Sequence, residues 1–316
     1  MTDSATSQGA GSAAPPAVKA RLTMLAEMMD VDLAAAVRGL VELGIRDLDL
    51  KNHVFGCAIA DLDGLSRERL AALVAETGTS VYCFSSVLGH RNIDRVGEAA
   101  FRAEFEAGVA NMVETARVVR PAKVRLLSCL FDERAAYPDA TAYMDRHAPW
   151  VYAAYRDAVD HLAGAGLAAT VENEPNTVLS NPAETLAFFE RLERPAVGFT
   201  WDVQNMWQSG TYPTVEVYRA LRPLIDYLHV KGGRTRDGMP GELAFRCPLD
   251  EASWPVAEIV GETLADGVSP VICLNPSHGA VADSYSLAPL AGTPALTRAE
   301  ALRDAAFLRS RFGEFA

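Results

Sequence analysis

The sequence predicts one closed (β/α)8 barrel, and three observations lead to this prediction. Eight short apolar segments alternate with eight segments of helical periodicity along the chain. Strict alternation of this kind is typical of parallel strands joined by right-handed crossovers. The chain is long enough for such a barrel, which needs about 250 residues. A GxGxxG loop is absent from the sequence, which disfavours the rival fold, a doubly wound open sheet.

The expected elements follow one another from residue 21 to the end of the chain. The expected strands are residues 21–25, 45–51, 80–86, 123–131, 167–173, 197–202, 226–231 and 270–275. The expected helices cover about 30–43, 66–77, 95–119, 148–164, 182–193, 214–222, 255–265 and 297–311. Ser66 and the pair Thr297 and Glu300 are expected to cap two of these helices. Residues 1–18 are expected to be a disordered leader, and 19–316 a single barrel domain.

Composition and charge exclude several classes of partner. Asp and Glu outnumber Lys and Arg by 41 to 29, and no basic block stands out, so nucleic acid is not an expected partner. No apolar run reaches the roughly 18 residues of a membrane span, and no secretory signal opens the chain. Five scattered cysteines without a CxxC pair indicate reduced thiols and a cytoplasmic protein. A homo-oligomer is compatible with all of these features.

Four late strands end in polar residues that suit a metal ion. These residues are Glu172, Asp202, His229 and Asn275, each about one strand–helix unit from the next. The carboxyl ends of barrel strands form the active-site face, so these side chains are expected to converge. Carboxylate, imidazole and amide groups suit Mn, Mg, Co or Zn better than soft metals. The sequence therefore predicts one divalent metal ion held by these residues.

Side-chain alternation adds further candidates on the same faces of the strands. Lys231 shares a strand face with His229, because side chains two residues apart point the same way. In the strand 45–51, Leu48 and Leu50 should face the helices, which directs Asp49 and Lys51 into the barrel. Asp49 is therefore a candidate for substrate binding. A buried Asp–Lys network without a chemical role explains the same pattern.

Each ligand candidate has an ordinary structural alternative. His229 fits a buried histidine bonded to the backbone, and Asp202 fits the cap of a loop. Glu174 has the same parity as Glu172 and competes with it as the ligand, although Glu172 lies better at the strand end. Asn275 precedes a proline, which also suits a simple turn residue.

Three other residues are expected near the substrate. Trp201 is a candidate for stacking on a sugar ring, with core packing as its alternative. His53 and His278 lie in expected loops above the strand ends, from which either would reach the site. For His278, a solvated surface position is the alternative.

Three segments at the strand ends carry a resemblance to a known family. They are TVEN (170–173), VGFTWDVQN (197–205) and YLHVKG (227–232). Together with GIRDLDL (44–50) and PLDEASWP (248–255), they resemble the sugar phosphate isomerase/epimerase superfamily, the xylose isomerase-like barrels. The similarity spans about residues 20–312 and implies that Glu172, Asp202 and His229 are metal ligands. Asn275 stands where the family usually has a glutamate ligand, and Asn205 where it has a second histidine.

The resemblance implies an enzyme that acts on a sugar or sugar-like hydroxy-ketone. A metal ion that grips two adjacent substrate oxygens polarises the carbonyl and stabilises an enediolate. Glu172 is the candidate base, and Lys231 would stabilise developing oxyanion charge or bind a substrate phosphate. Glu174 and Asn205 are candidates for substrate binding. The expected activity is that of a divalent-metal-dependent isomerase or epimerase.

Two alternatives stay open at the level of the sequence. Asn275 is unable to transfer a proton, which disfavours an epimerisation that uses two glutamates. A lyase of the same fold, of the dehydratase or C-glycoside-cleaving type, would instead use His53 or His278 as the acid for the leaving group. A metal-free barrel that binds a sugar or a partner protein is the other alternative, and Asn205 and Asn275 favour it.

Overall fold

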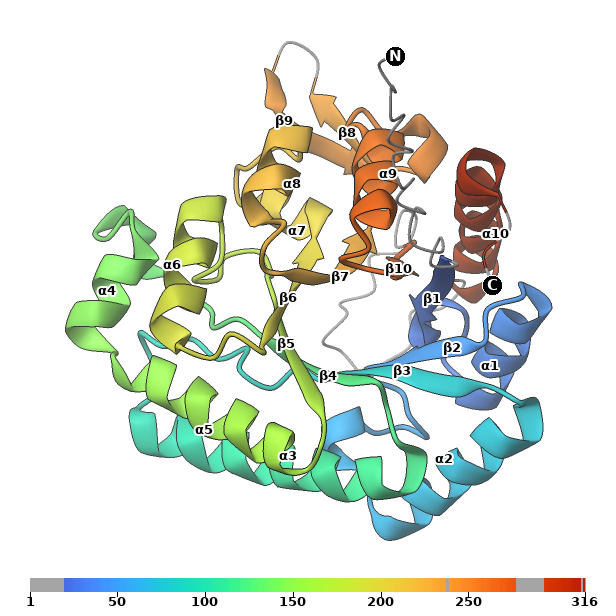
Figure 1. The fold of residues 1–316 in the computed structure, drawn as a ribbon, viewed down its shortest axis with the longest axis horizontal. Coiled ribbons are helices and arrows are strands. Elements are labelled where there is room, and N and C mark those ends of the chain that lie inside the picture. Colours follow the sequence, from blue (N-terminus) through green and yellow to red (C-terminus); the bar gives the residue numbers. More distant parts are fainter. Residues whose placement is uncertain (1–19, 237–238, 277–292, 314, 316) are drawn as a thin grey trace, which may run out of the picture.

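Eight parallel strands form a closed barrel, as predicted from the sequence (Figure 1). The computed structural model describes residues 20–236, 239–276, 293–313 and 315. In their order around the barrel the strands are β1 (Arg21–Leu25), β10 (Val271–Leu274), β7 (Ile225–Val230), β6 (Gly198–Asp202), β5 (Ala168–Glu172), β4 (Lys123–Leu127), β3 (Ser80–Ser85) and β2 (Asp47–Leu50). Because neighbouring strands are parallel, their carboxyl ends lie at one end of the barrel, here called the mouth.

Helices surround the barrel and correspond to the expected ones (Figure 1). They are α1 (Leu33–Glu42), α2 (Gly64–Thr77), α3 (Glu98–Val119), α5 (Trp150–Gly164), α6 (Pro182–Leu192), α8 (Val215–Leu221), α9 (Val256–Asp266) and α10 (Thr293–Phe312). Aromatic rings fill the layer between α3, α5 and α6. The ring of Tyr155 packs edge-on against Phe105 at 5.0 Å and Phe188 at 5.4 Å. None of the described helices is long and apolar enough to cross a membrane.

Several boundaries differ from the expected ones. Helix α2 begins at Gly64, because the carboxylate of Asp63, not Ser66, caps it by accepting the backbone N–H of Ser66 at 2.8 Å. Helix α10 begins at Thr293, so Thr297, expected as its cap, lies inside the helix. Strand β4 ends at Leu127, since the chain beyond it hydrogen-bonds to loops.

Some elements had no clear sequence signal. They are the helices α4 (Ala140–His147) and α7 (Val203–Gln208), the antiparallel pair β8 (Gly233–Arg236) and β9 (Met239–Arg246), and the 3-10 turns η1 (Ala26–Met28), η2 (Ile59–Asp61), η3 (Glu133–Ala135) and η4 (Leu249–Glu251). The β8–β9 pair forms a separate two-stranded sheet outside the barrel, beside α7 (Figure 1). The expected leader 1–18 and His278 lie outside the described residues.

Alternation along the barrel strands places polar residues inside. On β2, Leu48 and Leu50 belong to the main hydrophobic core, whereas Asp49 accepts a hydrogen bond from Tyr227 of β7 at 2.7 Å. Strands β2 and β7 are not neighbours, so this bond crosses the barrel interior. The interior is therefore lined by polar side chains that lead to the mouth.

Candidate active site

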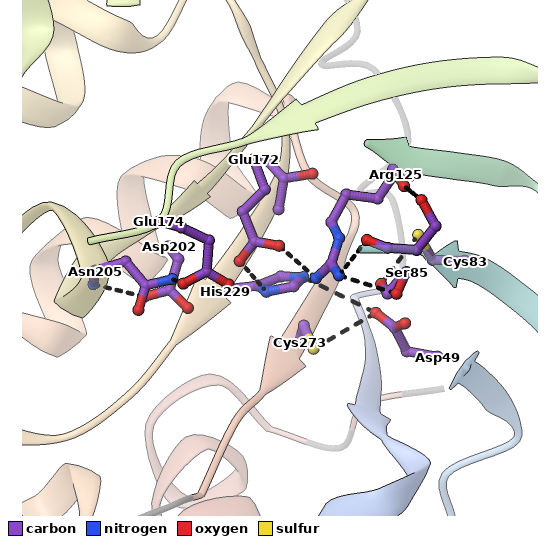
Figure 2. A network of polar contacts seen from close by, with 12 residues as sticks. Asp49, Cys83, Ser85, Arg125, Glu172, Glu174, Asp202, Asn205, His229 and Cys273 are labelled. Carbon is purple, nitrogen blue, oxygen red and sulfur yellow. Dashed lines mark hydrogen bonds and ion pairs between the residues drawn. The ribbon is translucent and has the colours of Figure 1, made fainter. Parts of the chain in front are cut away.

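Glu172, Asp202 and His229 come together at the carboxyl ends of β5, β6 and β7 (Figure 2). One oxygen or nitrogen atom of each lies within 4.8 Å of those of the other two, and all three side chains are buried. The strand register explains this, since Asp202 lies opposite His229, and Glu172 lies opposite Thr200 on the same strand as Asp202. The barrel thus brings together the three residues that the sequence suggested as metal ligands.

Asp202 uses its two carboxylate oxygens for different contacts. Its Oδ1 accepts the backbone N–H groups of Gln204 at 3.1 Å and Asn205 at 2.9 Å, which caps α7. Its Oδ2 lies 2.8 Å from Nζ of Lys231. Asp202 thus caps a helix, whereas the sequence had suggested the cap of a loop as its structural alternative, and the cap uses only one of the two carboxylate oxygens.

Several buried polar atoms at this point make no hydrogen bond within the described part of the chain. They include Asn275 Oδ1 and His229 Nε2. Asp202 Oδ2 and His229 Nδ1 each have one charged neighbour instead, Lys231 and Glu172 respectively. Such atoms are costly unless a ligand satisfies them. Oxygen donors with one imidazole are a donor set that suits a divalent cation. Glu172, Asp202 and His229 therefore fit a cation site.

Asn275 lies directly after β10, beside the end of β7. Its backbone N–H donates to the carbonyl of Val230 at 3.1 Å, and its side chain is buried. The position agrees with a fourth ligand from the neighbouring strand. A neutral amide oxygen at this point would contribute no charge to the site.

Arg125 of β4 is a buried cation that the sequence analysis missed. Its guanidinium forms an ion pair with Glu172 Oε2 and donates to the carbonyls of Ser85 at 2.9 Å and Ser86 at 2.8 Å (Figure 2). The residue is 1% exposed. A charged residue inside the apolar segment KVRLL was the available signal, because only the polar barrel interior accommodates it.

The two glutamates after β5 differ in their electrostatic surroundings. Burial raises the pKa of Glu172, but the positive charges of Arg125, His229 and Lys231 outweigh it and bring the pKa below its ordinary value. Burial and the negative charge of Glu172 raise the pKa of Glu174. Glu172 is therefore held ionised, while Glu174 binds a proton more readily.

A hydrogen-bonded chain connects Lys231 to Glu174. Lys231 Nζ donates to Asn205 Oδ1 at 2.9 Å, and Asn205 Nδ2 donates to Glu174 Oε2 at 2.9 Å. Together with the contact between Lys231 and Asp202, this chain fixes the ammonium group at the mouth. All four side chains are buried, so their orientation is well determined by their partners.

A family model described as a xylose isomerase-like TIM barrel matches residues 37–255. The chain belongs to this family. No curated protein matches the sequence.

Solved structures of low sequence identity share the fold. A D-allulose 3-epimerase from Methylomonas sp. is 13% identical and has a TM-score of 0.66, with 93% of this chain and 98% of that chain covered. The probable 3-DHS dehydratase from Bacillus anthracis is 16% identical, with a TM-score of 0.63 and coverage of 93% and 99%. A xylose isomerase-like protein from Mycobacterium smegmatis, solved with magnesium, is 18% identical, with a TM-score of 0.61 and coverage of 91% and 96%. At these identities the likeness shows the fold alone.

The remaining candidates lie at different depths. Trp201 is fully buried and stacks on Tyr218 of α8, so the core-packing alternative describes its position and it does not line the mouth. Asp49 is also fully buried, beneath His229. His53 lies in the loop after β2 and is partly exposed, and His278 lies outside the described residues.

A further acidic residue lies on the side of the mouth opposite β5. Glu27, in η1 directly after β1, accepts the backbone N–H of Asn52 at 2.7 Å. Burial raises the pKa of Glu27, and the positive charge of Lys51 offsets part of this rise. Burial, assisted by the charge of Arg125, lowers the pKa of Lys51. The sequence gave no sign of Glu27, because it follows a strand whose end was placed before it.

Proposed function

We propose that the protein is a divalent-metal-dependent isomerase or epimerase that acts on a sugar or sugar-like hydroxy-ketone. The observation that carries the proposal is the convergence of one potential ligand atom each from Glu172, Asp202 and His229 at the barrel mouth. Active sites of this fold are built at that end. Membership of the xylose isomerase-like family supports the proposal, as do solved relatives described as epimerases.

The proposed roles follow from the contacts at the mouth. Glu172, Asp202 and His229, with Asn275 as a fourth donor, would hold the cation, either Mn, Mg, Co or Zn. When bound, this cation would supply positive charge that polarises a substrate carbonyl and stabilises an enediolate. Lys231, fixed by Asp202 and Asn205, would donate a hydrogen bond to the same developing negative charge.

Glu172 is the proposed base, and Glu174 is the alternative proton carrier. The ion pair with Arg125 keeps Glu172 in the ionised form that a base requires, although the same charge weakens its basicity. Glu174 lies two residues further on and is bonded to Asn205, which fixes its carboxyl group. His53 would act as an acid from the loop above.

One observation favours a lyase as a second candidate. Asn275 stands beside the end of β7 with an amide in place of a proton-carrying carboxyl group. The described carboxyl groups around Lys231 then come from β5 and β6, on one side of the mouth. Elimination from a keto-sugar, with a base and an acid on one face of the substrate, suits this arrangement.

The experiment combines metal analysis with a substrate screen in deuterated water. Protein purified without chelator should carry close to one equivalent of divalent metal, and it should turn over a keto-sugar or hydroxy-ketone. Deuterium in the recovered substrate and in an isomeric product would support the isomerase, whereas an unsaturated product would support the lyase. Protein that takes up no divalent metal and turns over none of the compounds would refute both and favour the metal-free binding barrel.

A further inference from the structure

His229 lies between two carboxylates at the centre of the barrel. Its Nδ1 is 3.1 Å from Glu172 Oε1, and its Nε2 is 3.9 Å from Asp49 Oδ2 (Figure 2). The side chains of His229 and Asp49 are 0% exposed and that of Glu172 is 2% exposed. The imidazole therefore has one ring nitrogen directed to Glu172 and the other directed to Asp49.

Asp49 is fixed beneath the imidazole by groups from two other strands. Tyr227 of β7 donates its hydroxyl hydrogen to Asp49 Oδ2 at 2.7 Å, and the Cys273 thiol of β10 lies 3.9 Å from the same oxygen. The Tyr227 ring meets His229 edge-on, with 4.6 Å between the centroids. These contacts favour a supporting role for Asp49 over direct contact with a substrate, and the substrate-binding role expected from the sequence stays a prediction.

The role of Asp49 depends on which ring nitrogen of His229 carries a proton. A neutral imidazole carries one proton, and a nitrogen that binds a cation must be unprotonated. A cation held beside Glu172 would take the lone pair of Nδ1, so the single proton would lie on Nε2. A buried N–H group needs an acceptor, and Asp49 is the carboxylate next to this nitrogen, at 3.9 Å, which is longer than a hydrogen bond and would have to shorten when a cation binds. Metal-binding histidines commonly donate their other N–H to such a carboxylate.

We propose that Asp49, held by Tyr227, is a positioning residue that orients His229 and fixes its proton on Nε2, so that Nδ1 is presented to the cation. This inference rests on the proposed function, because it assumes a cation at Glu172, Asp202 and His229. A competing arrangement uses the lower group, since Asp49, His229 and Cys273 also offer ligand atoms within 4.8 Å of one another. In that arrangement Nε2 and the Cys273 thiolate would bind the ion.

The first test compares the affinity for Co²⁺ of matched variants by calorimetry. Asp49→Asn should weaken binding by about 10- to 100-fold, and Tyr227→Phe should weaken it less. Asp47→Asn is the control, because Asp47 lies two residues earlier on the same strand face and contacts Arg21 instead of His229. Its affinity should match that of the wild type. Melting of the metal-free proteins separates a loss of fold from a loss of positioning.

The second test uses the intact wild-type protein and does not depend on any variant that fails to fold. With the protein labelled by ¹⁵N-histidine and loaded with Zn²⁺, the His229 signals should show a protonated Nε2 and a metal-bound Nδ1. His229→Gln assigns these signals. Metal on Nε2, or a cobalt–thiolate absorption band that disappears in Cys273→Ser, would overturn the inference and place the ion in the lower group.

The outcomes also separate this inference from the proposed function. If the wild type binds Co²⁺ and Asp49→Asn binds it equally well, only the positioning role is refuted. If the wild type binds none of the divalent cations, the proposed function is refuted and the positioning role with it.

Discussion

The two ends of the barrel hold buried charges in different ways. At the end opposite the mouth, Lys123 contacts both the carboxylate of Asp226 at 3.0 Å and its carbonyl at 2.9 Å. The other carboxylate oxygen of Asp226 accepts the hydroxyl of Thr170 at 2.8 Å. Asp47 likewise contacts Arg21 at 3.0 Å. Each of these charged groups has a partner within the chain.

At the mouth, the charged groups are closer together and less completely paired. Within the described residues, Asn275 Oδ1 and Asp49 Oδ1 make no hydrogen bond, although both atoms are buried. Glu172 shares one site with Arg125 and His229. Unmet hydrogen-bonding capacity of this kind marks the mouth as a ligand site, whereas complete pairing at the opposite end serves stability.

The largest contrast is expected from neutralising one acid at each end. Glu172→Gln removes the proposed base and ligand and should lower kcat by about 10³-fold or more. Asp226→Asn, at the opposite end, should change kcat by less than about threefold, because it lies far along the strands from the mouth. Steady-state kinetics on the substrate from the screen, with circular dichroism as a check of folding, measures both. Retention of most activity in Glu172→Gln would contradict the assigned roles.

The next contrast concerns stability and compares one cation at each end. Arg125→Met leaves Glu172 buried without its ion-pair partner and should lower the free energy of unfolding by about 3–5 kcal/mol. Lys123→Met should cost less, about 1–2 kcal/mol, since the side chain of its partner Asp226 is 33% exposed. Urea denaturation of the metal-free proteins measures the difference. Equal losses would mean that the mouth and the opposite end do not differ in this respect.

The barrel was predictable because its determinants are local. Each strand is apolar and each helix carries a periodic face, and their alternation restricts the topology. The β8–β9 pair was missed because Gly233–Arg246 lacks the strict alternation of a half-buried strand, and it lies in the connection between β7 and the helix expected at about 255–265. Helix α7 was missed because it depends on a cap from Asp202, a residue already assigned to the site.

The candidate site was predictable only in part. Parallel register alone aligns the strand ends, so Glu172, Asp202 and His229 could be brought together from spacing. Trp201 was placed near the substrate although it adjoins Asp202 on the same strand, and alternation therefore turns it outward to α8. The ion pair of Arg125 with Glu172 depends on contact between two strands in three dimensions. The spacing of residues in the sequence does not predict this pairing.

Acid should destabilise the mouth through His90, in the loop that follows β3. Burial lowers the pKa of His90 to about 4, against about 6.5 in the unfolded chain. The unfolded state then binds a proton at this side chain more readily than the folded state does. The contribution of neutral His90 to the free energy of unfolding is therefore fully present above pH 6.5 and is lost as the pH falls towards 4. The loss is at most about 3 kcal/mol. Urea unfolding between pH 7.5 and 4 should show a flatter profile for His90→Gln than for the wild type, and identical profiles would contradict the assignment.

The smallest effect is expected from adding a charge at the mouth. Asn275→Glu would place a carboxylate where the structure has a buried amide oxygen without a hydrogen bond. An additional charged ligand tightens cation binding, and we expect about a tenfold lower Kd for Mn²⁺, or about 1.4 kcal/mol. Asn275→Ala, which removes the oxygen, should weaken binding by a few-fold. Calorimetry on both variants tests whether this side chain faces the ion, because equal affinities would assign Asn275 to the turn before Pro276 and leave three protein ligands at the mouth.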